Sequence, residues 1–274
     1  MRHPSSSRGP TSFPVRVLRS ARLTLHVVEG VATTLVVFPW VEPPRRRELV
    51  RRWSVRMLRM LKVETRFHGV PEGGLPGNLL IVANHISWLD IFVLNTLQPA
   101  RFVAKAELRR WPVVGWLSHS VGTVFVERAR RRHTGSVNRD TAAALRRGDV
   151  VAIFPEGTAT EGTTLLPFKG SLLQPIVDAE GHVQPIAIRY RDIEGAQTAA
   201  PAYAGDTSFM TSFWNVTGER RLVAELHLVA ALPARARHRR ELARAAEDAI
   251  RMALAATANG SAPDTRGDRR AGPR

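Results

Sequence analysis

Two apolar runs, each followed at once by polar residues, most constrain how this chain can fold. Leu79–Ala83 runs into Asn84–Asp90, and further along the chain Val150–Phe154 runs into Pro155–Thr158. Short continuous apolar runs are typical of strands that are buried on both faces of a parallel sheet. Because the carboxyl ends of such strands meet at one edge of the sheet, the sequence predicts a single active site there.

The remainder of the chain alternates between strand and helix patterns. Strands are predicted at 64–68, 79–83, 101–104, 121–126, 150–154, 183–189 and 221–229, and helices at 87–97, 112–118, 136–147, 169–179 and 236–256. This alternation indicates an α/β fold, with a mixed, mainly parallel sheet flanked by helices. Residues 192–218 are expected to form a long loop.

The chain divides into four predicted segments. We expect a disordered N-terminus at 1–14, a membrane-associated helical segment at 15–62, one globular domain at 63–257 and a disordered tail at 258–274. The globular domain should contain the whole predicted sheet.

The N-terminal segment is apolar and flanked by arginines. Leu23–Val41 is mostly apolar, but His26, Glu29, Gly30 and Pro39 interrupt it, which makes it marginal as a spanning helix or a signal peptide. Positive charge on both sides argues against a simple span. It favours a hairpin or an interfacial helix with both ends on the cytoplasmic face.

A second amphipathic helix is predicted directly after this apolar stretch. Apolar residues recur at helical spacing within Glu48–Lys62, with arginines between them: Leu49, Trp53, Met57, Met60 and Leu61. Such a pattern fits an ordinary helix that packs on a protein core. Next to the apolar stretch it favours a helix that lies on an anionic membrane.

The charge balance narrows the partners. The formal net charge of +16 favours an anionic partner, which is a nucleic acid, an anionic membrane or an acidic substrate. The sequence carries no zinc finger, no RNP-type aromatic pair and no Gly-x-x-Gly loop with helical flanks, and its arginines concentrate in residues 1–62 and in the tails. We therefore expect anionic membrane lipids, and no nucleic acid, as partners. The absence of cysteine excludes a thiolate nucleophile and Cys-ligated metals.

His85 and Asp90 form the candidate catalytic pair. On a regular helix, side chains five residues apart point about 140° away from each other. The two can therefore meet only if His85 lies in the turn before a helix and Asp90 lies in its first turns. Asp90 would then hold one ring nitrogen and leave the other free as a general base. No Gly-x-Ser-x-Gly elbow is present, and Ser87 is either a nucleophile or, as we favour, a helix cap.

Further candidate binding residues lie near the second run. Glu156 could bind a polyol, orient a basic side chain or cap a helix, and Gly157 would let the backbone approach a ligand closely. Arg128 ends the predicted strand 122–128, where it suits a phosphate or a carboxylate or is simply a surface arginine. The only lysines of this arginine-rich chain are Lys62, Lys105 and Lys169. Two of them lie close to these motifs, either by chance or because a compact ammonium group is needed there.

Four blocks in this order resemble the glycerophospholipid acyltransferase family, and bacterial 1-acylglycerol-3-phosphate acyltransferases in particular. The family patterns are Asn-His-x4-Asp, Gly-x-x-Phe-x-x-Arg, Phe-Pro-Glu-Gly-Thr and a Val-x-Pro strand. They correspond here to Asn84–Asp90, Gly122–Arg128, Phe154–Thr158 and Val183–Ile188. The resemblance covers roughly residues 64–190, and the ordered set is highly specific.

The resemblance implies a membrane-associated O-acyltransferase on the cytoplasmic face of the bacterial inner membrane. His85, oriented by Asp90, would deprotonate the free hydroxyl of a lysolipid, which then attacks the thioester of acyl-CoA or acyl carrier protein. Substrate binding is implied for Lys105, Arg128, Glu156, Gly157 and Thr158. Neither a metal nor a bound cofactor is expected.

One departure from the family pattern bears on the acceptor. The implied acceptor is 1-acyl-sn-glycerol-3-phosphate, which would give phosphatidic acid. However, Ala159 stands where the family often has an arginine that can pair with phosphate. Either Lys105, Arg128 and Lys169 compensate, or the acceptor is a lyso-ornithine lipid or another lysolipid. Outside this class, the alternative is a non-catalytic basic protein that binds membranes or nucleic acid.

Overall fold

The computed structural model describes residues 11–126, 131–258 and 269–270. Its helices are α1 Phe13–Val36, α2 Pro43–Met60, α3 Leu89–Leu97, α4 Pro112–Ser120, α5 Arg131–Arg146, α6 Gln174–Asp178, α7 Phe209–Gly218 and α8 Arg239–Ala258, with 3-10 turns η1 Phe38–Trp40, η2 Ala106–Arg110 and η3 Gly170–Leu173. Its strands are β1 Val63–His68, β2 Leu79–Ala83, β3 Arg101–Lys105, β4 Val124–Val126, β5 Val150–Ile153, β6 His182–Arg191, β7 Leu222–Leu228, β8 Leu232–Pro233 and β9 Arg269–Arg270.

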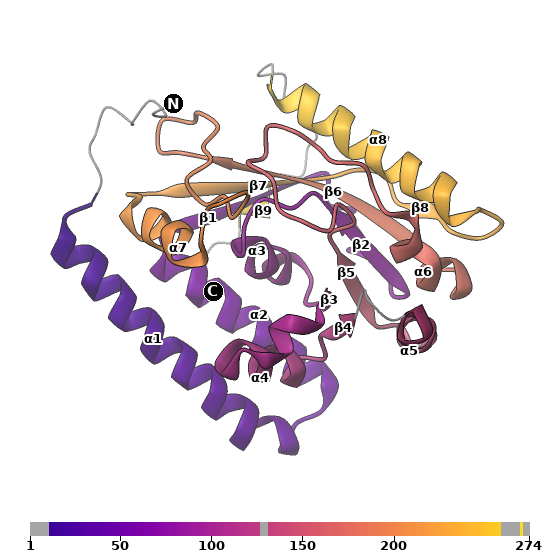
Figure 1. The fold of residues 1–274 in the computed structure, drawn as a ribbon, viewed down its shortest axis with the longest axis horizontal. Helices are drawn as coiled ribbons and strands as arrows, with labels where there is room; N and C mark the ends of the chain where they lie inside the picture. The colour runs from indigo at the N-terminus through magenta and orange to yellow at the C-terminus, as the bar shows by residue number, and fades with distance from the viewer. Residues whose placement is uncertain (1–10, 127–130, 259–268, 271–274) are drawn as a thin grey trace.

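The described strands form one mixed sheet with helices on both faces (Figure 1). The strand order is β4-β3-β5-β2-β6-β7-β1-β9, and β8 pairs with β6 off this path. Strands β4, β3, β5, β2 and β6 run parallel, β7 runs antiparallel to β6, and β1 is parallel to β7. The predicted α/β class with a mainly parallel sheet is confirmed.

Strands β2 and β5 are buried on both faces, as their continuous apolar runs require. Alternate residues of β2 enter two different cores. Ile81 belongs to a core that includes side chains from α1, α2, α3 and α7, whereas Leu80 belongs to a core that includes side chains from α5, α6 and α8. Figure 1 shows α8 on one side of the sheet and the N-terminal helices on the other. This two-sided burial fixes the register of β2 and therefore the position of the motif that follows it.

Two sequence predictions on the C-terminal side need correction. The predicted loop 192–218 contains helix α7, which begins after Ser208, whose side chain accepts a hydrogen bond from the Thr211 N–H at 3.1 Å as an N-cap. The predicted helix 169–179 is broken into η3 and the short helix α6. Pro175 lies in the first turn of α6, where its missing N–H costs no helical hydrogen bond.

The apolar face of α2 is packed inside the protein and does not face outward. Met57, Leu58 and Leu61 are buried in the core beside α3. The predicted interfacial role of this helix is therefore wrong in its geometry, because the same apolar stripe serves as a core face. Sequence periodicity alone does not distinguish a protein core from a membrane, since both receive an apolar stripe.

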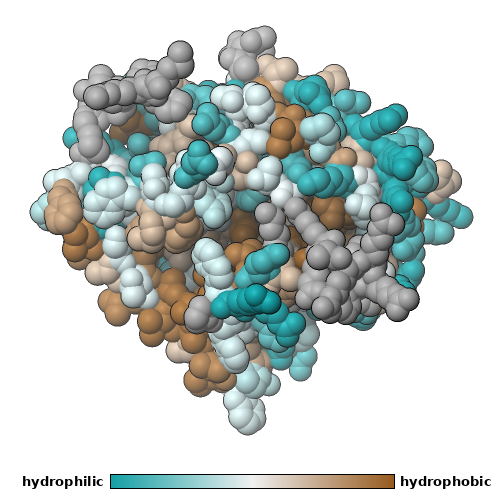
Figure 2. Space-filling model, viewed as in Figure 1, coloured by the Kyte–Doolittle hydropathy of each residue, from teal (hydrophilic) through white to brown (hydrophobic). Residues whose placement is uncertain are grey.

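Helix α1 carries the exposed apolar surface of the N-terminal segment. Leu25 is 70% exposed and Trp40, in the following turn, is 87% exposed. Other exposed apolar residues of α1 are Phe13, Val17, Leu18, Val28, Leu35 and Val36. Figure 2 shows apolar surface along the lower left side of the molecule, where α1 runs in Figure 1. By length and composition, the segment Phe13–Trp40 is long and apolar enough to cross a membrane.

The predicted disordered ends fall mainly outside the described residues. Helix α1 already begins at Phe13, so the N-terminal boundary predicted at 14 lies inside a helix. Within the predicted tail 258–274, Ala258 closes α8 and Arg269–Arg270 pairs with β1 as β9.

Candidate active site

The structure brings His85 and Asp90 together at the carboxyl end of β2. His85 lies in the turn after the strand, and Asp90 is the second residue of α3. The His85 Nδ1 and Asp90 Oδ2 atoms are 2.8 Å apart. This is the strand–turn–helix geometry that the sequence predicts. In the tautomer with hydrogen on Nδ1, the carboxylate accepts a hydrogen bond from Nδ1–H. Nε2, which has no protein hydrogen-bond partner among the described residues, is then left with the free lone pair.

Asp90 is sealed from solvent, and both of its carboxylate oxygens are hydrogen-bonded. Its side chain is 0% exposed, whereas that of His85 is 21% exposed. Besides His85, Oδ2 accepts hydrogen bonds from the N–H groups of Ile86 at 2.8 Å and Ser87 at 2.9 Å. Oδ1 accepts one from the Tyr190 hydroxyl at 2.7 Å. These hydrogen bonds satisfy both oxygens of the buried side chain and fix its orientation.

The side chain of Asn84 fixes the start of the turn. Its Nδ2 donates to the Ile188 carbonyl oxygen at 3.0 Å, and its Oδ1 accepts from the Ile188 N–H at 2.7 Å. Strand pairing between β2 and β6 ends at Ala83↔Ile186, and β6 continues to Arg191. The amide of Asn84 therefore takes the place of a backbone partner for β6, which lets the chain turn away without leaving buried polar groups unpaired.

Glu156 holds the backbone of the catalytic turn from the other side. Its Oε1 accepts a hydrogen bond from the His85 N–H at 2.7 Å, and its Oε2 accepts one from the Leu166 N–H at 2.8 Å. The residue is only 2% exposed, and burial raises its pKa despite these two hydrogen bonds. With both oxygens occupied, the carboxylate positions His85, and its predicted contact with an acceptor headgroup stays a prediction.

Two further residues enclose His85. The Phe154 ring stacks on the imidazole, with ring centroids 4.1 Å apart and an interplanar angle of 14°. Thr160 donates its backbone N–H to the His85 carbonyl oxygen at 2.8 Å. The imidazole is thus held by a carboxylate at its edge, an aromatic ring on its face and hydrogen bonds at both backbone groups. Such fixation suits a general base, whose efficiency depends on a defined orientation.

Comparison with known proteins places this site in a family. The family model described as Acyltransferase matches residues 63–189. A lyso-ornithine lipid O-acyltransferase of Pseudomonas aeruginosa is 37% identical over 252 residues, which cover 88% of this chain and 94% of that protein. This chain belongs to the acyltransferase family.

Other relatives agree with this assignment. A 1-acyl-sn-glycerol-3-phosphate acyltransferase of Neisseria gonorrhoeae is 40% identical over 161 residues, which cover 59% of this chain and 63% of that protein. The chain thus matches less than two thirds of the length of this relative. The crystal structure of the 1-acyl-sn-glycerophosphate acyltransferase of Thermotoga maritima shares the fold, with a TM-score of 0.61 at 20% identity over 89% of this chain and 98% of that chain.

For the other predicted site residues of this acyltransferase, the structure gives a position in the fold but no described contact with His85 or Asp90. Gly157 has φ of 78°, in the left-handed region that favours glycine, and Thr158 is exposed. Lys105 is the last residue of β3, where it pairs with Val126 of β4. Arg128 lies outside the described residues. Substrate contacts of these residues, like the absence of a cofactor, stay predictions.

Ser87 is not arranged as a nucleophile. It is 0% exposed, and its Oγ accepts a hydrogen bond from the Leu89 N–H at 3.2 Å. The Ser87 hydroxyl thus accepts the N–H of the first residue of α3, but the N-cap residue of that helix is Trp88, so the interpretation of Ser87 as the cap stays a prediction.

Sequence reasoning missed Tyr190, Thr160 and the stacking role of Phe154. Tyr190 is one residue of a long apolar strand and carries no motif of its own. Thr160 lies two residues beyond Thr158, outside the recognised block. Only Phe154 belonged to a motif, and there it reads as the last residue of a buried strand. Each role depends on a contact between distant parts of the chain, so no local signal could reveal it.

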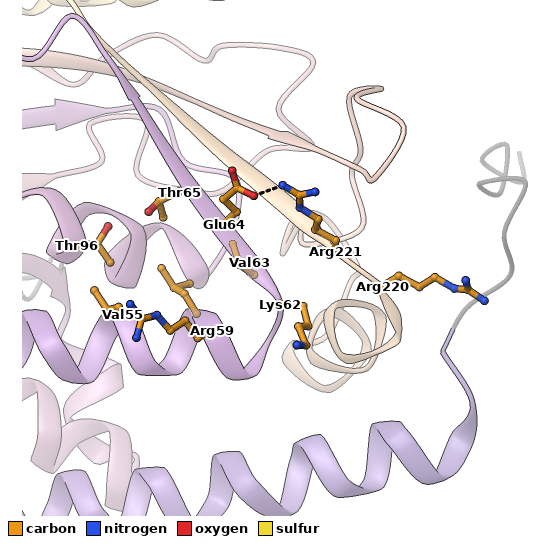
Figure 3. Close-up of a pocket in the computed structure, with 10 residues that line it drawn as sticks. Val55, Arg59, Lys62, Val63, Glu64, Thr65, Thr96, Arg220 and Arg221 are labelled. Carbon is orange, nitrogen blue, oxygen red and sulfur yellow. Dashed lines mark hydrogen bonds and ion pairs between the residues drawn. The ribbon is translucent and has the colours of Figure 1, made fainter. Parts of the chain in front are cut away.

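A surface cavity of about 590 Å³ lies apart from this site, at the end of α2 and the start of β1 (Figure 3). Four basic residues line it: Arg59, Lys62, Arg220 and Arg221. Figure 3 shows Arg221 directed at Glu64, with which it forms an ion pair, whereas the side chain of Arg220 extends away from the cavity. None of its lining residues belongs to the His85 site, so it is not the catalytic pocket.

Proposed function

We propose that this protein is a membrane-associated lysolipid O-acyltransferase. The observation that carries the proposal is the 2.8 Å contact between His85 Nδ1 and Asp90 Oδ2. It leaves Nε2 as an oriented base in a chain that belongs to the acyltransferase family. A non-catalytic relative would not need the complete set of partners around Asp90, nor the stacking of Phe154 on the imidazole.

The geometry supports direct acyl transfer without a covalent enzyme intermediate. Nε2 of His85 removes the proton from the free hydroxyl of the lysolipid as that oxygen attacks the thioester carbonyl carbon of acyl-CoA or acyl carrier protein. Asp90 stabilises the imidazolium that forms. The tetrahedral oxyanion then collapses and expels the thiolate, which takes the proton from Nε2. The products are an ester and a free thiol, and the imidazole returns to its starting state.

Two acceptors are supported by different observations. The 40% identity to the Neisseria gonorrhoeae protein supports 1-acyl-sn-glycerol-3-phosphate, as the sequence motifs do. Similarity along 88% of the chain to lyso-ornithine lipid O-acyltransferases of Pseudomonas aeruginosa and Rhizobium meliloti supports a lyso-ornithine lipid. Ala159 points the same way, since it places no guanidinium after the Glu156 motif. We therefore favour the lyso-ornithine lipid.

The exposed apolar face of α1 supports membrane association. A lysolipid acceptor is delivered most directly from a bilayer, and exposed side chains such as Leu25 and Val28 can enter the apolar part of an interface. Arginines on both sides of the segment favour the cytoplasmic leaflet, where acyl-CoA and acyl carrier protein are available.

An acceptor panel tests the proposal. Purified full-length protein is incubated in mixed vesicles with labelled acyl-CoA or acyl carrier protein and, in turn, lyso-ornithine lipid, lysophosphatidate or lysophosphatidylethanolamine. We expect ester formation with lyso-ornithine lipid at a higher kcat/KM than with the other two. Higher efficiency with lysophosphatidate would overturn the choice of acceptor. Thioester-dependent acylation of none of them would overturn the proposed function.

A charge variant sharpens the choice of acceptor. Ala159→Arg restores a guanidinium after the Glu156 motif, and we expect it to raise kcat/KM for lysophosphatidate relative to lyso-ornithine lipid. Thr163→Arg adds the same charge to an exposed position of the same loop and serves as the matched control. An equal change in both variants would assign the effect to net charge rather than to a contact at position 159.

A further inference from the structure

The two oxygens of Asp90 have different surroundings. Oδ2 accepts three hydrogen bonds, from His85 Nδ1 and from the N–H groups of Ile86 and Ser87. Among the described residues, Oδ1 accepts a single hydrogen bond, from the hydroxyl of Tyr190 at 2.7 Å. All the donors on Oδ2 come from the catalytic turn itself, whereas the donor on Oδ1 comes from a strand far along the chain. In the part of the chain that the structure describes, Tyr190 is thus the one residue distant in sequence that donates a hydrogen bond to this carboxylate.

The position of Tyr190 is set by the extension of β6 beyond the end of β2. Tyr190 lies on the same face of β6 as Ile186 and Ile188, toward α3. The backbone of Ile188 is paired with the side chain of Asn84, so the strand is tied to the catalytic turn two residues before Tyr190. Tyr190 pairs with Ala224 of β7 on its other side and is only 1% exposed. The phenol is therefore buried at the place where its hydroxyl meets Asp90.

The direction of this hydrogen bond is fixed by the chemistry of the phenol. Burial, and then the negative charge of Asp90, raise the pKa of Tyr190 well above its ordinary value. The hydroxyl consequently keeps its proton at any pH at which the enzyme would work. The phenol therefore donates its O–H to Asp90 Oδ1, which accepts it.

We infer that Tyr190 is a positioning residue that sets the basicity of His85 through Asp90. This inference rests on the proposed function. The phenol fixes the rotation of the carboxylate so that Oδ2 faces Nδ1. Its hydrogen bond also stabilises part of the negative charge of Asp90. Without it, only donors of the catalytic turn would stabilise that charge.

The effect on His85 depends on whether the hydrogen bond from Tyr190 stabilises the site more with a neutral imidazole or with an imidazolium. When the imidazole is neutral, the charge of Asp90 is uncompensated, and the hydrogen bond from Tyr190 is at its strongest. When the imidazolium forms, it draws the same charge toward Oδ2, and the bond at Oδ1 weakens. Tyr190 therefore stabilises the neutral base preferentially. Glu156, on the segment after β5, is the other carboxyl group that acts on His85, and it is the same in wild type and in a Tyr190 variant. Loss of the Tyr190 hydroxyl should therefore move the acidic limb of the pH–rate profile to higher pH.

Tyr190→Phe tests this with a single atom removed. We expect kcat to fall about 10-fold with KM for the acceptor changed less than about 2-fold. The pH at which kcat/KM reaches half its maximum should rise by roughly half to one unit. The only other tyrosine, Tyr203, lies half-exposed, so Tyr203→Phe is the matched control and should leave the profile unchanged. A wild-type profile in Tyr190→Phe would overturn the inference.

A second variant keeps the test valid if Tyr190→Phe folds poorly. Because the chain has two tyrosines, biosynthetic 3-fluorotyrosine in the Tyr203→Phe background labels position 190 alone. The fluorinated phenol is a stronger donor, so the acidic limb should move to lower pH, opposite to the phenylalanine variant. Its 19F resonance should shift on Asp90→Asn. An unchanged pH–rate profile, or a 19F resonance that does not shift on Asp90→Asn, would overturn the inference.

The outcomes separate this inference from the proposed function. Wild-type protein that transfers no acyl chain defeats the function, whereas active wild-type protein with an unchanged Tyr190→Phe profile defeats only the role of Tyr190. A purely structural role would scale the rate at every pH by the same factor and leave the midpoint in place. Circular dichroism and thermal melting of each variant give the folded fraction with which rates are normalised.

Discussion

The carboxylate of Glu156 accepts a hydrogen bond from the backbone of His85, with 2.7 Å between Glu156 Oε1 and the His85 nitrogen. The two residues follow β5 and β2, which pair in parallel from Leu79↔Val150 to Val82↔Ile153. Adjacent strands thus deliver the two motifs to the same edge of the sheet. Glu156 controls where the histidine sits, whereas Asp90 controls which ring nitrogen carries the proton.

His85→Ala removes the proposed base. We expect acyl transfer to fall by about 10²–10⁴-fold, the usual contribution of positioned proton transfer. The fold should survive, because Asp90 keeps the N–H donors of Ile86 and Ser87 and the Tyr190 hydroxyl. Initial rates with labelled thioester check the loss. His182→Ala, at an exposed position of β6, is the control, and near wild-type turnover of His85→Ala would refute the base assignment.

Two substitutions of Asp90 separate charge from hydrogen bonding. In Asp90→Asn the amide oxygen can still accept from His85, Ile86 and Ser87, and its nitrogen can donate to the oxygen of Tyr190. We expect a folded protein that has lost the negative charge and is slower by about 10²–10⁴-fold, as in related dyads and triads.

Asp90→Ala should instead destabilise the fold. It leaves the buried N–H groups of Ile86 and Ser87 without an acceptor, at a cost of about 1–3 kcal/mol each. Chemical denaturation of both variants measures the difference. Equal stability of the alanine and asparagine variants would show that these hydrogen bonds do not hold the turn.

Glu156→Gln should lower both activity and stability. One carboxylate oxygen becomes an NH2 group that faces the N–H of either His85 or Leu166, and one buried donor loses its acceptor at about 1–3 kcal/mol. Glu161→Gln, at an exposed position of the same loop, is the control. Unchanged activity and stability in Glu156→Gln would contradict the positioning role.

The stability difference at position 156 should depend on pH in a defined direction. Burial raises the pKa of Glu156 above its ordinary value of 4.5, so the folded state binds this proton more tightly than the unfolded state. The associated stability is complete below pH 4.5 and is lost as pH rises through the raised pKa. The advantage of wild type over Glu156→Gln should therefore shrink as pH rises, and denaturation from pH 4 to pH 7 measures it. A stability difference that grows with rising pH would show that the pKa of Glu156 is lowered and not raised.

Membrane binding should depend on the exposed face of α1. Paired substitutions Leu25→Asp and Val28→Asp place charges on side chains that are exposed in the structure. We expect at least a 10-fold loss of binding to anionic vesicles, because each buried apolar side chain is worth roughly 1.5–3 kcal/mol. Met252→Asp, at an exposed position of α8, is the control. Unchanged sedimentation of the paired variant with vesicles would count against this surface.

Removal of residues 1–62 is not a clean test of the same point. It would take Met57, Leu58 and Leu61 out of the core as well as removing α1. Loss of large buried side chains typically costs about 2–5 kcal/mol each. Such a truncation should fail to fold. Any loss of membrane binding would then reflect unfolding and not the absence of the α1 surface.

Much of the site could be predicted because its parts are local in sequence. The apolar runs before Asn84 and Pro155 identify two buried strands, and the five-residue spacing of His85 and Asp90 is satisfied by a turn followed by a helix start. Helix α7 also had a local signal, Ser208 as an N-cap before apolar residues at helical spacing.

The sequence by itself determined the two buried strands, the α/β class and the identity of the base with its carboxylate partner. These depend on hydrophobic periodicity and short-range spacing, which a single segment carries. Only the tertiary structure decided that α2 faces the core while α1 faces outward, that Glu156 holds the His85 backbone and that Tyr190 caps the carboxylate. Those relationships join residues far apart in the chain, and packing and hydrogen-bond satisfaction of the whole fold choose such partners.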